Sequence, residues 1–186
     1  MYEKEIKRVL FTKEQIAARV KELGEEISRD YAGESVTMVC TLRGATIFFA
    51  DLVREIKCDV EIDFVACSSY GSGTTTSGEV KMQKDLSSPI EGKNVIVVED
   101  IIDTGTTLLA LTRLLKTRNP KSLKVCSFLD KPSRRKVDFE GDYIGFEIEN
   151  EFVIGYGLDY NQKVRNLPEV CILAPEVYMP DLNKAL

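Results

Sequence analysis

The 186-residue sequence contains no histidine, and this absence narrows the chemistry open to it. Proton transfer near neutral pH then falls to a carboxylate, lysine, tyrosine or cysteine with a shifted pKa. A metal site would be built mostly from oxygen ligands, which suit Mg²⁺ and disfavour zinc.

Long apolar runs are also absent: none approaches the ~20 residues that span a bilayer, and residues 1–5 lack the apolar core of a signal peptide. The formal net charge of -5 argues against broad electrostatic binding to nucleic acid. The cysteines form no CxxC pair and lie in apolar segments, so we predict reduced core residues: Cys40, Cys58, Cys67, Cys126 and Cys171. We therefore expect a cytoplasmic protein without membrane or nucleic-acid partners.

The apolar pattern alternates between strand-like and helix-like segments. Strands are predicted at 6–11, 36–42, 60–67, 93–102, 123–129, 143–146, 152–156 and 170–173. Helices are predicted at 12–31, 45–56 and 104–117, the first beginning with a capping box at Thr12. This order predicts one α/β domain over residues 1–186, with a mainly parallel sheet flanked by helices. The N-terminal and C-terminal segments are expected to form a small lobe beside it.

The strongest motif is VIVVEDIIDTGTTL at 95–108. An apolar strand delivers Glu99 and Asp100 to the carboxyl edge of a sheet, where open α/β folds bind ligands. Asp103 then begins a Gly/Thr-rich turn into a helix, whose free N–H groups and hydroxyls form an anion cradle. Asp103 or Thr104 alone would be read as a helix cap. The ordered run of acids and threonines favours a functional site.

This run resembles the phosphoribosyl pyrophosphate signature of type I phosphoribosyltransferases. The surrounding sequence resembles the hypoxanthine-guanine phosphoribosyltransferase family over essentially the whole chain. The resemblance implies the type I phosphoribosyltransferase fold, with a hood over the purine. It also implies Mg²⁺-dependent transfer of the 5-phosphoribosyl group to hypoxanthine or guanine in purine salvage, giving IMP or GMP and pyrophosphate. The family is commonly dimeric or tetrameric, so a homodimer or homotetramer is expected.

The resemblance assigns a role to each residue of the motif. Glu99 and Asp100 would hold the ribose hydroxyls, directly or through Mg²⁺, and Asp103 would act on purine N7 as general base or acid. Ile101 would pack against the base. The 5′-phosphate would be bound by Asp103, Thr104, Gly105, Thr106 and Thr107. Many members carry lysine in place of Thr106, which leaves the charge balance of the phosphate site open.

Two further stretches match the family. Thr41 to Gly44 matches the pyrophosphate loop, in which Arg43 would meet pyrophosphate with forked geometry and Gly44 would permit close backbone approach. The peptide before the basic residue is often cis in the family. The polar stretch at 68–82, with the Ser69–Tyr70 pair, would be a lid that excludes water from the reaction. Taken alone, the two stretches are an ordinary strand-to-helix turn and a mobile loop.

The purine would be recognised from the C-terminal half. Lys131 would donate to purine O6, which selects 6-oxopurines because adenine would leave a buried cation facing an amino group. Phe152 would stack on the base and the Val153 backbone would meet its edge. Asp159 would approach the base site and the pyrophosphate-bound Mg²⁺, and Arg165 would contact pyrophosphate. Without the resemblance, Phe152 would be read as core and Lys131 as exposed.

Three alternatives compete with this interpretation. One is a sibling enzyme with another base preference, such as xanthine. The second is a regulator that keeps the fold but uses nucleotide or phosphoribosyl pyrophosphate as an effector without catalysis. The third is an α/β phosphate-binding or phosphatase-like protein whose acids ligate metal for hydrolysis.

Overall fold

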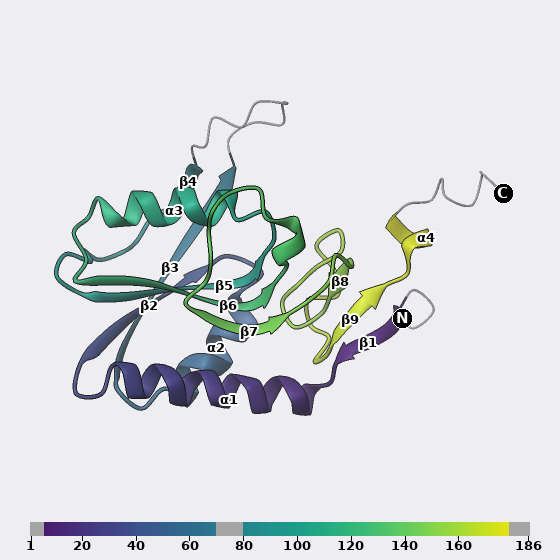
Figure 1. Cartoon of the computed structure of the whole chain (residues 1–186), viewed down its shortest axis with the longest axis horizontal. Helices are drawn as coiled ribbons and strands as arrows, with labels where there is room; N and C mark the ends of the chain where they lie inside the picture. Colours follow the sequence, from purple (N-terminus) through teal and green to yellow (C-terminus); the bar gives the residue numbers. More distant parts are fainter. Residues whose placement is uncertain (1–5, 70–79, 179–186) are drawn as a thin grey trace.

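The computed structural model describes residues 6–69 and 80–178, which form two sheets (Figure 1). The strands of the larger sheet have the order β4-β3-β2-β5-β6-β7, and those of the smaller sheet the order β1-β9-β8. The elements in chain order are β1 (Ile6–Phe11), α1 (Lys13–Asp30), β2 (Ser35–Thr41), α2 (Thr46–Glu55), β3 (Asp59–Ser69), β4 (Val80–Lys84), β5 (Asn94–Ile102), α3 (Thr106–Lys116), β6 (Ser122–Asp130), η1 (Pro132–Arg134), β7 (Tyr143–Glu147), β8 (Val153–Ile154), β9 (Val170–Leu173) and α4 (Pro175–Tyr178).

The larger sheet is parallel from β3 to β7, and only β4 joins it antiparallel. Its central strands are buried on both faces because successive side chains point to opposite sides. Met38 and Ile96 pack in the core shared with α1 and α2. Val39 and Val97 pack in the core under α3. Figure 1 shows α3 on one face of the sheet and α1 with α2 on the other, so the prediction of a mainly parallel α/β fold is confirmed.

Helix α1 forms as its sequence predicts. Thr12 and Gln15 exchange side-chain and backbone hydrogen bonds in a capping box. The apolar positions, spaced at helical intervals, are buried: Ile16, Val20, Leu23 and Ile27. On the same helix, Arg19 donates to the carbonyl oxygens of Ile144 and Gly145, each at 2.8 Å, and thereby fixes the helix against the edge strand β7.

Three local predictions differ from the structure. The strand expected at 152–156 is only the two-residue β8, because Gly155 and Leu158 close a tight turn with mutual hydrogen bonds of 3.0 Å. The helix expected from residue 104 begins at Thr106, after Gly105. Strand β4 and the short helices η1 and α4 were not predicted, since VKMQK, PSR and PEVY are brief.

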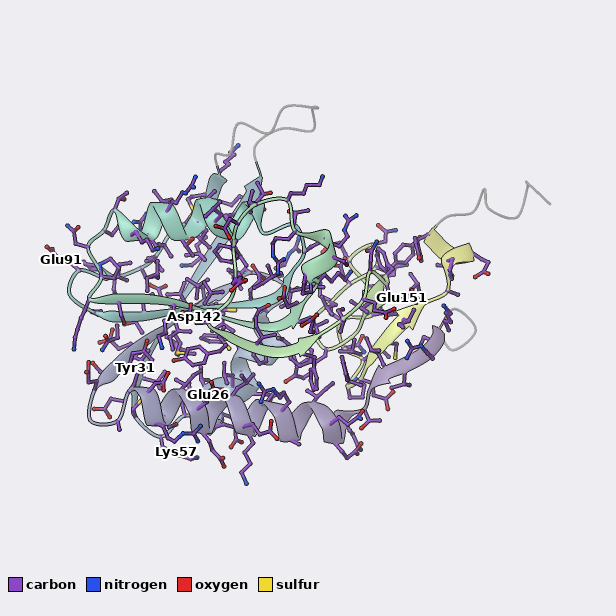
Figure 2. All side chains as sticks on the ribbon, in the orientation of Figure 1. Glu26, Tyr31, Lys57, Glu91, Asp142 and Glu151 are labelled. Atoms are coloured by element: carbon purple, nitrogen blue, oxygen red, sulfur yellow. The ribbon has the colours of Figure 1, made fainter. Side chains whose placement is uncertain are left out.

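The smaller sheet joins segments from the two ends of the sequence: β9 pairs antiparallel with both β1 and β8. It lies beyond the end of the larger sheet at which β7 finishes (Figure 1). In Figure 2, Glu151 lies beside this smaller sheet, whereas Glu91, just before β5, lies at the far end of the larger sheet. The carboxyl ends of the parallel strands therefore face the smaller sheet, which we call the hood.

Cys40, Cys126 and Cys171 are buried, as predicted for core residues, whereas Cys58 and Cys67 are only partly buried; all five are free. Within residues 6–69 and 80–178, no helix combines the length and the apolar character that a membrane crossing requires.

Candidate active site

Two adjacent carboxylates, Glu99 and Asp100, lie near the carboxyl end of strand β5. The Thr41 hydroxyl lies 2.8 Å from Oε1 of Glu99 and 2.9 Å from the Val98 carbonyl oxygen, so it donates to one of them at a time. The Asp100 N–H donates to the same Glu99 oxygen at 3.0 Å. Burial, and then the negative charge of Asp100, raise the pKa of Glu99 well above its ordinary value. A cation beside this pair would relieve that repulsion.

Three segments that are distant in sequence meet at Gly44. A Cβ atom added to Gly44 would lie 1.6 Å from Oδ2 of Asp100, so only glycine lets the loop approach the acid pair. From the other side, a Cβ atom on Gly157 would lie 2.1 Å from the Gly44 carbonyl oxygen. The Leu42–Arg43 peptide is cis, as the resemblance implied, and the Arg43 side chain is exposed.

The turn into α3 contains a residue that must be glycine. Gly105 has a φ of 78°, in the left-handed region, and a Cβ there would lie 2.9 Å from Cδ of Arg135. Thr106 begins the helix, and its N–H lies 3.4 Å from the Thr104 hydroxyl. The turn and the acid pair share one hollow of about 210 Å³, lined by Glu99, Asp100, Ile101, Ile102, Asp103, Thr104, Gly105, Thr107 and Leu108.

Lys131 is a buried cation beside this hollow. Only 9% of the residue is exposed, and its Nζ donates to the Glu151 carbonyl oxygen at 2.7 Å. Burial lowers the pKa of Lys131, because a charged ammonium loses solvation there. The interpretation as an ordinary exposed lysine is therefore wrong.

Two arginines after Lys131 contact the turn between β5 and α3, and the sequence analysis assigned neither of them a role. Arg134 Nε donates to Oδ1 of Asp103 at 3.0 Å, in an ion pair between half-exposed side chains. Arg135 reaches the backbone of the same turn. A signal was present: PSRRK follows β6, the parallel neighbour of β5, and so begins at the same sheet edge as the acids.

Phe152 lies in the hood and is half-buried, so it is not a simple core residue. Its ring stacks on Tyr178, with centroids 4.8 Å apart and an angle of 25°, and meets Tyr160 edge to face at 5.9 Å. Val153 is buried and pairs with Ile172 of β9. The hood thus presents an aromatic cluster beside the carbonyl that Lys131 contacts.

The loop after β8 brings together the other two residues expected near pyrophosphate. Arg165 donates to the Gly157 carbonyl oxygen at 2.8 Å and forms an ion pair of 2.8 Å with Asp159. In the same loop, the Tyr156 hydroxyl donates to Oδ2 of Asp51 in α2 at 2.7 Å. These contacts hold the loop against Gly44 on one side and α2 on the other.

Of the expected lid, the structure describes only residues 68–69 and 80–82. Ser69 is the last described residue of β3, while Tyr70 and the rest of the expected lid through residue 79 lie outside the described residues. Among the residues that are described, no three histidine, cysteine, aspartate or glutamate side chains converge as a metal cage. Glu99, Asp100 and Asp159 thus do not form a preformed three-carboxylate site.

Comparison with known proteins agrees with this geometry. Residues 9–161 match the family model of the phosphoribosyl transferase domain. The chain is 49% identical to a hypoxanthine-guanine phosphoribosyltransferase of Streptococcus thermophilus (strain CNRZ 1066), over 96% of this chain and 99% of the relative.

Two solved structures are similar over nearly the whole fold. A hypoxanthine phosphoribosyltransferase from Staphylococcus aureus has a TM-score of 0.91 and 47% identity, covering 94% of this chain and 95% of that one. A hypoxanthine-guanine phosphoribosyltransferase from Bacillus anthracis has a TM-score of 0.88 and 50% identity, covering 91% and 100%. The chain therefore belongs to the phosphoribosyltransferase family, and within it to the hypoxanthine-guanine phosphoribosyltransferases.

Proposed function

We propose that the protein transfers the 5-phosphoribosyl group from phosphoribosyl pyrophosphate to hypoxanthine or guanine, giving IMP or GMP and pyrophosphate in purine salvage. The observation that carries this proposal is the hollow of about 210 Å³ in which the acids of β5 meet the N-terminal turn of α3. A turn of that kind suits a phosphate, and adjacent acids suit ribose hydroxyls or a cation. The buried cation Lys131 beside it suits a purine carbonyl.

The donor set fits Mg²⁺. Glu99 and Asp100 offer adjacent carboxylate oxygens, and Asp159 offers a third. Burial, and then the charge of Asp100, raise the pKa of Glu99, so a cation beside the pair would favour its charged form. Mg²⁺ commonly binds through one or two carboxylates together with substrate phosphates, so a complete protein cage is not required. When bound, the ion would neutralise charge on the departing pyrophosphate.

The reaction is a substitution at ribose C1′, in which pyrophosphate leaves and the base nitrogen bonds to the carbon. Thr104, Gly105, Thr106 and Thr107, with Asp103, bind the 5′-phosphate through backbone N–H groups and hydroxyls at the start of α3. Arg43 and Arg165 stabilise the pyrophosphate as it leaves, because their guanidinium groups match phosphate geometry. Asp103 takes or returns the proton on purine N7.

The base is held from the other side of the hollow. Lys131 donates to O6, Ile101 and Phe152 pack against the faces of the ring, and the Val153 backbone meets its edge. Glu151, the residue before Phe152, links Phe152 to Lys131: its carbonyl oxygen accepts a hydrogen bond from the Lys131 ammonium group. This contact thus brings together two segments assigned to the base that are distant in sequence.

We further propose that residues 68–82 close over the site, with Ser69 and Tyr70 in the lid, and that the enzyme is a cytoplasmic homodimer or homotetramer. The lid proposal is supported by the antiparallel pairing of Ser69 with Val80, which brings both ends of the segment together. The free cysteines support a reducing compartment.

The direct test is a spectrophotometric assay with phosphoribosyl pyrophosphate, Mg²⁺ and, separately, hypoxanthine, guanine, xanthine and adenine. We expect nucleotide from hypoxanthine or guanine, loss of turnover on chelation and negligible turnover of adenine. Preference for xanthine would make the protein a sibling enzyme. Tight binding of phosphoribosyl pyrophosphate without turnover of any base would refute the proposed reaction and favour a regulator.

A further inference from the structure

The carbonyl groups of Ile102, Asp103 and Thr104, which lead into the turn before α3, accept hydrogen bonds from residues 131–136. The Lys131 N–H donates to the Ile102 carbonyl oxygen at 2.9 Å, and the Lys136 N–H donates to that of Thr104 at 3.0 Å. Between them, the guanidinium of Arg135 donates to the carbonyl oxygens of Ile102 and Asp103 at 3.1 and 2.5 Å. Three consecutive carbonyl groups therefore face one segment.

The planar trans peptide bond determines where the N–H groups of the turn point. In each peptide unit the carbonyl of one residue and the N–H of the next point in opposite directions. Holding the carbonyl groups of residues 102 to 104 therefore turns the N–H groups of residues 103 to 105 away from the segment. Within the described part of the chain, no backbone carbonyl group accepts a hydrogen bond from the N–H groups of Thr104 and Gly105. Unpaired donors in a half-buried turn are free to bind an anion.

Further contacts fix the Arg135 side chain beside the turn. Its guanidinium also pairs with Asp130, and both side chains are largely buried. Its methylene groups lie directly beneath Gly105, since a Cβ there would come within 2.9 Å of Cδ. The side chain thus contacts the turn through both polar and apolar atoms, whereas the neighbouring Arg134 is exposed.

We propose that Arg135 is a positioning residue for phosphoribosyl pyrophosphate: it holds the carbonyl groups of Ile102 and Asp103 so that the N–H groups of the turn face the 5′-phosphate. Arg135 does not touch the substrate in this proposal. The inference rests on the proposed function, because it assumes that the turn binds that phosphate. It goes further by assigning the orientation of the phosphate donors to a residue outside the 95–108 motif.

The test compares Arg135→Ala and Arg135→Lys with wild type by calorimetric binding of phosphoribosyl pyrophosphate with Mg²⁺, in the absence of base. We expect Arg135→Ala to weaken binding roughly 10- to 100-fold, the loss that a misplacement of about 1 Å produces in binding groups. The KM for hypoxanthine at saturating phosphoribosyl pyrophosphate should change less than about threefold. Arg135→Lys should lie between, because an ammonium keeps the charge but lacks the fork that serves two carbonyl groups.

A second readout separates positioning from general support of the fold. Added methylguanidinium, at a concentration that leaves wild type unchanged, should restore part of the lost affinity in Arg135→Ala and none in wild type. Lys136→Ala is the matched control: it removes a neighbouring exposed cation but keeps the backbone bond to Thr104, and should bind as wild type does.

Binding of phosphoribosyl pyrophosphate by Arg135→Ala within about twofold of wild type would overturn the inference, as would equal increases in both KM values. Should Arg135→Ala not fold, the Lys variant decides: an affinity equal to wild type overturns the proposal. Because binding is measured without base, wild type that binds phosphoribosyl pyrophosphate but forms no nucleotide refutes only the proposed reaction. The binding of phosphoribosyl pyrophosphate by wild type and the Arg135 variants then still tests the positioning role of Arg135.

Discussion

Replacing Lys131 with methionine removes the ammonium group but keeps an unbranched chain of similar length. The residue is 9% exposed, its Nζ contacts the Glu151 carbonyl, and burial lowers its pKa. The fold therefore keeps a cation where a neutral group would be more stable. A function that requires the cation explains why it is there, and base recognition should suffer more than folding when it is lost.

The magnitude follows from the chemistry of O6. A hydrogen bond from a charged group in a buried site contributes about 1.5–3 kcal/mol. Since 1.4 kcal/mol is a factor of ten, kcat/KM for hypoxanthine should fall roughly 10- to 150-fold in Lys131→Met. Affinity for phosphoribosyl pyrophosphate should stay within about twofold, because Lys131 does not line the phosphate hollow. The ratio of kcat/KM for hypoxanthine to kcat/KM for adenine should fall, because the cation that disfavours the adenine amino group is gone.

The pH dependence of the free energy of unfolding is an independent test of the buried Lys131 ammonium group. The pKa of Lys131 in the folded state is below its ordinary value of 10.5. At pH values between the folded-state pKa and 10.5, the unfolded chain therefore binds more protons than the folded chain. The free energy of unfolding of wild type should therefore rise relative to Lys131→Met as pH increases through the folded-state pKa toward 10.5. Denaturant titrations at pH 7 and through the alkaline range measure this difference.

Lys136→Met is the control for both experiments, because it removes an exposed cation from the same segment and should change neither. Steady-state assays with hypoxanthine and adenine, with calorimetry for phosphoribosyl pyrophosphate, complete the comparison. Equal weakening of hypoxanthine and phosphoribosyl pyrophosphate would refute the assignment of Lys131 to O6. Unchanged kcat/KM for hypoxanthine would refute it more directly.

Three other substitutions test separate parts of the structure. Asp103→Asn should bind phosphoribosyl pyrophosphate normally but lose roughly 10²–10⁴-fold in kcat, and normal turnover would remove its acid–base role. Gly44→Ala should raise the KM for phosphoribosyl pyrophosphate at least about tenfold by displacing a carboxylate; Gly33→Ala, strained but without close neighbours, should affect stability only. Asp63→Asn should lower the free energy of unfolding at pH 7 by about 1.5–3 kcal/mol in denaturant titrations. Burial raises the pKa of Asp63, but backbone hydrogen bonds outweigh it and lower the pKa, so this stabilisation is present above 3.8 and lost as pH falls through the folded-state value. The exposed Asp59→Asn is its control, and equal effects would contradict the argument.

Most of the helices and strands were predictable because the sequence patterns that indicate them are local. The central strands are short apolar runs, and the capping box at Thr12 marks the start of α1 within four residues. The hollow shared by the acid pair and the turn before α3 was also predictable, since every residue that lines it comes from 99–108. Local sequence is sufficient where one strand, one turn and one helix build the site without help from elsewhere.

The rest depends on contacts between distant segments. Gly44 meets Asp100 and Gly157 only once three segments distant in sequence are folded against one another, and no spacing in the sequence indicates this contact. The bond from Tyr156 to Asp51 spans 105 positions. Strand β4 has weak apolar character, and its pairing with β3 defines it. Such features follow from tertiary packing, which a linear pattern does not encode.

The charge distribution of the site explains why its anion binding relies on backbone groups. The chain carries a net charge of -5, and the hollow itself contains Glu99, Asp100 and Asp103. A polyanionic substrate entering it meets carboxylates, so the attraction must come from oriented N–H groups, from the cations at its rim and from a metal that the acids hold. Oriented N–H groups are effective only while the turn keeps its direction. In the proposed arrangement, a residue that fixes carbonyl groups behind the turn therefore contributes to binding although it does not touch the phosphate.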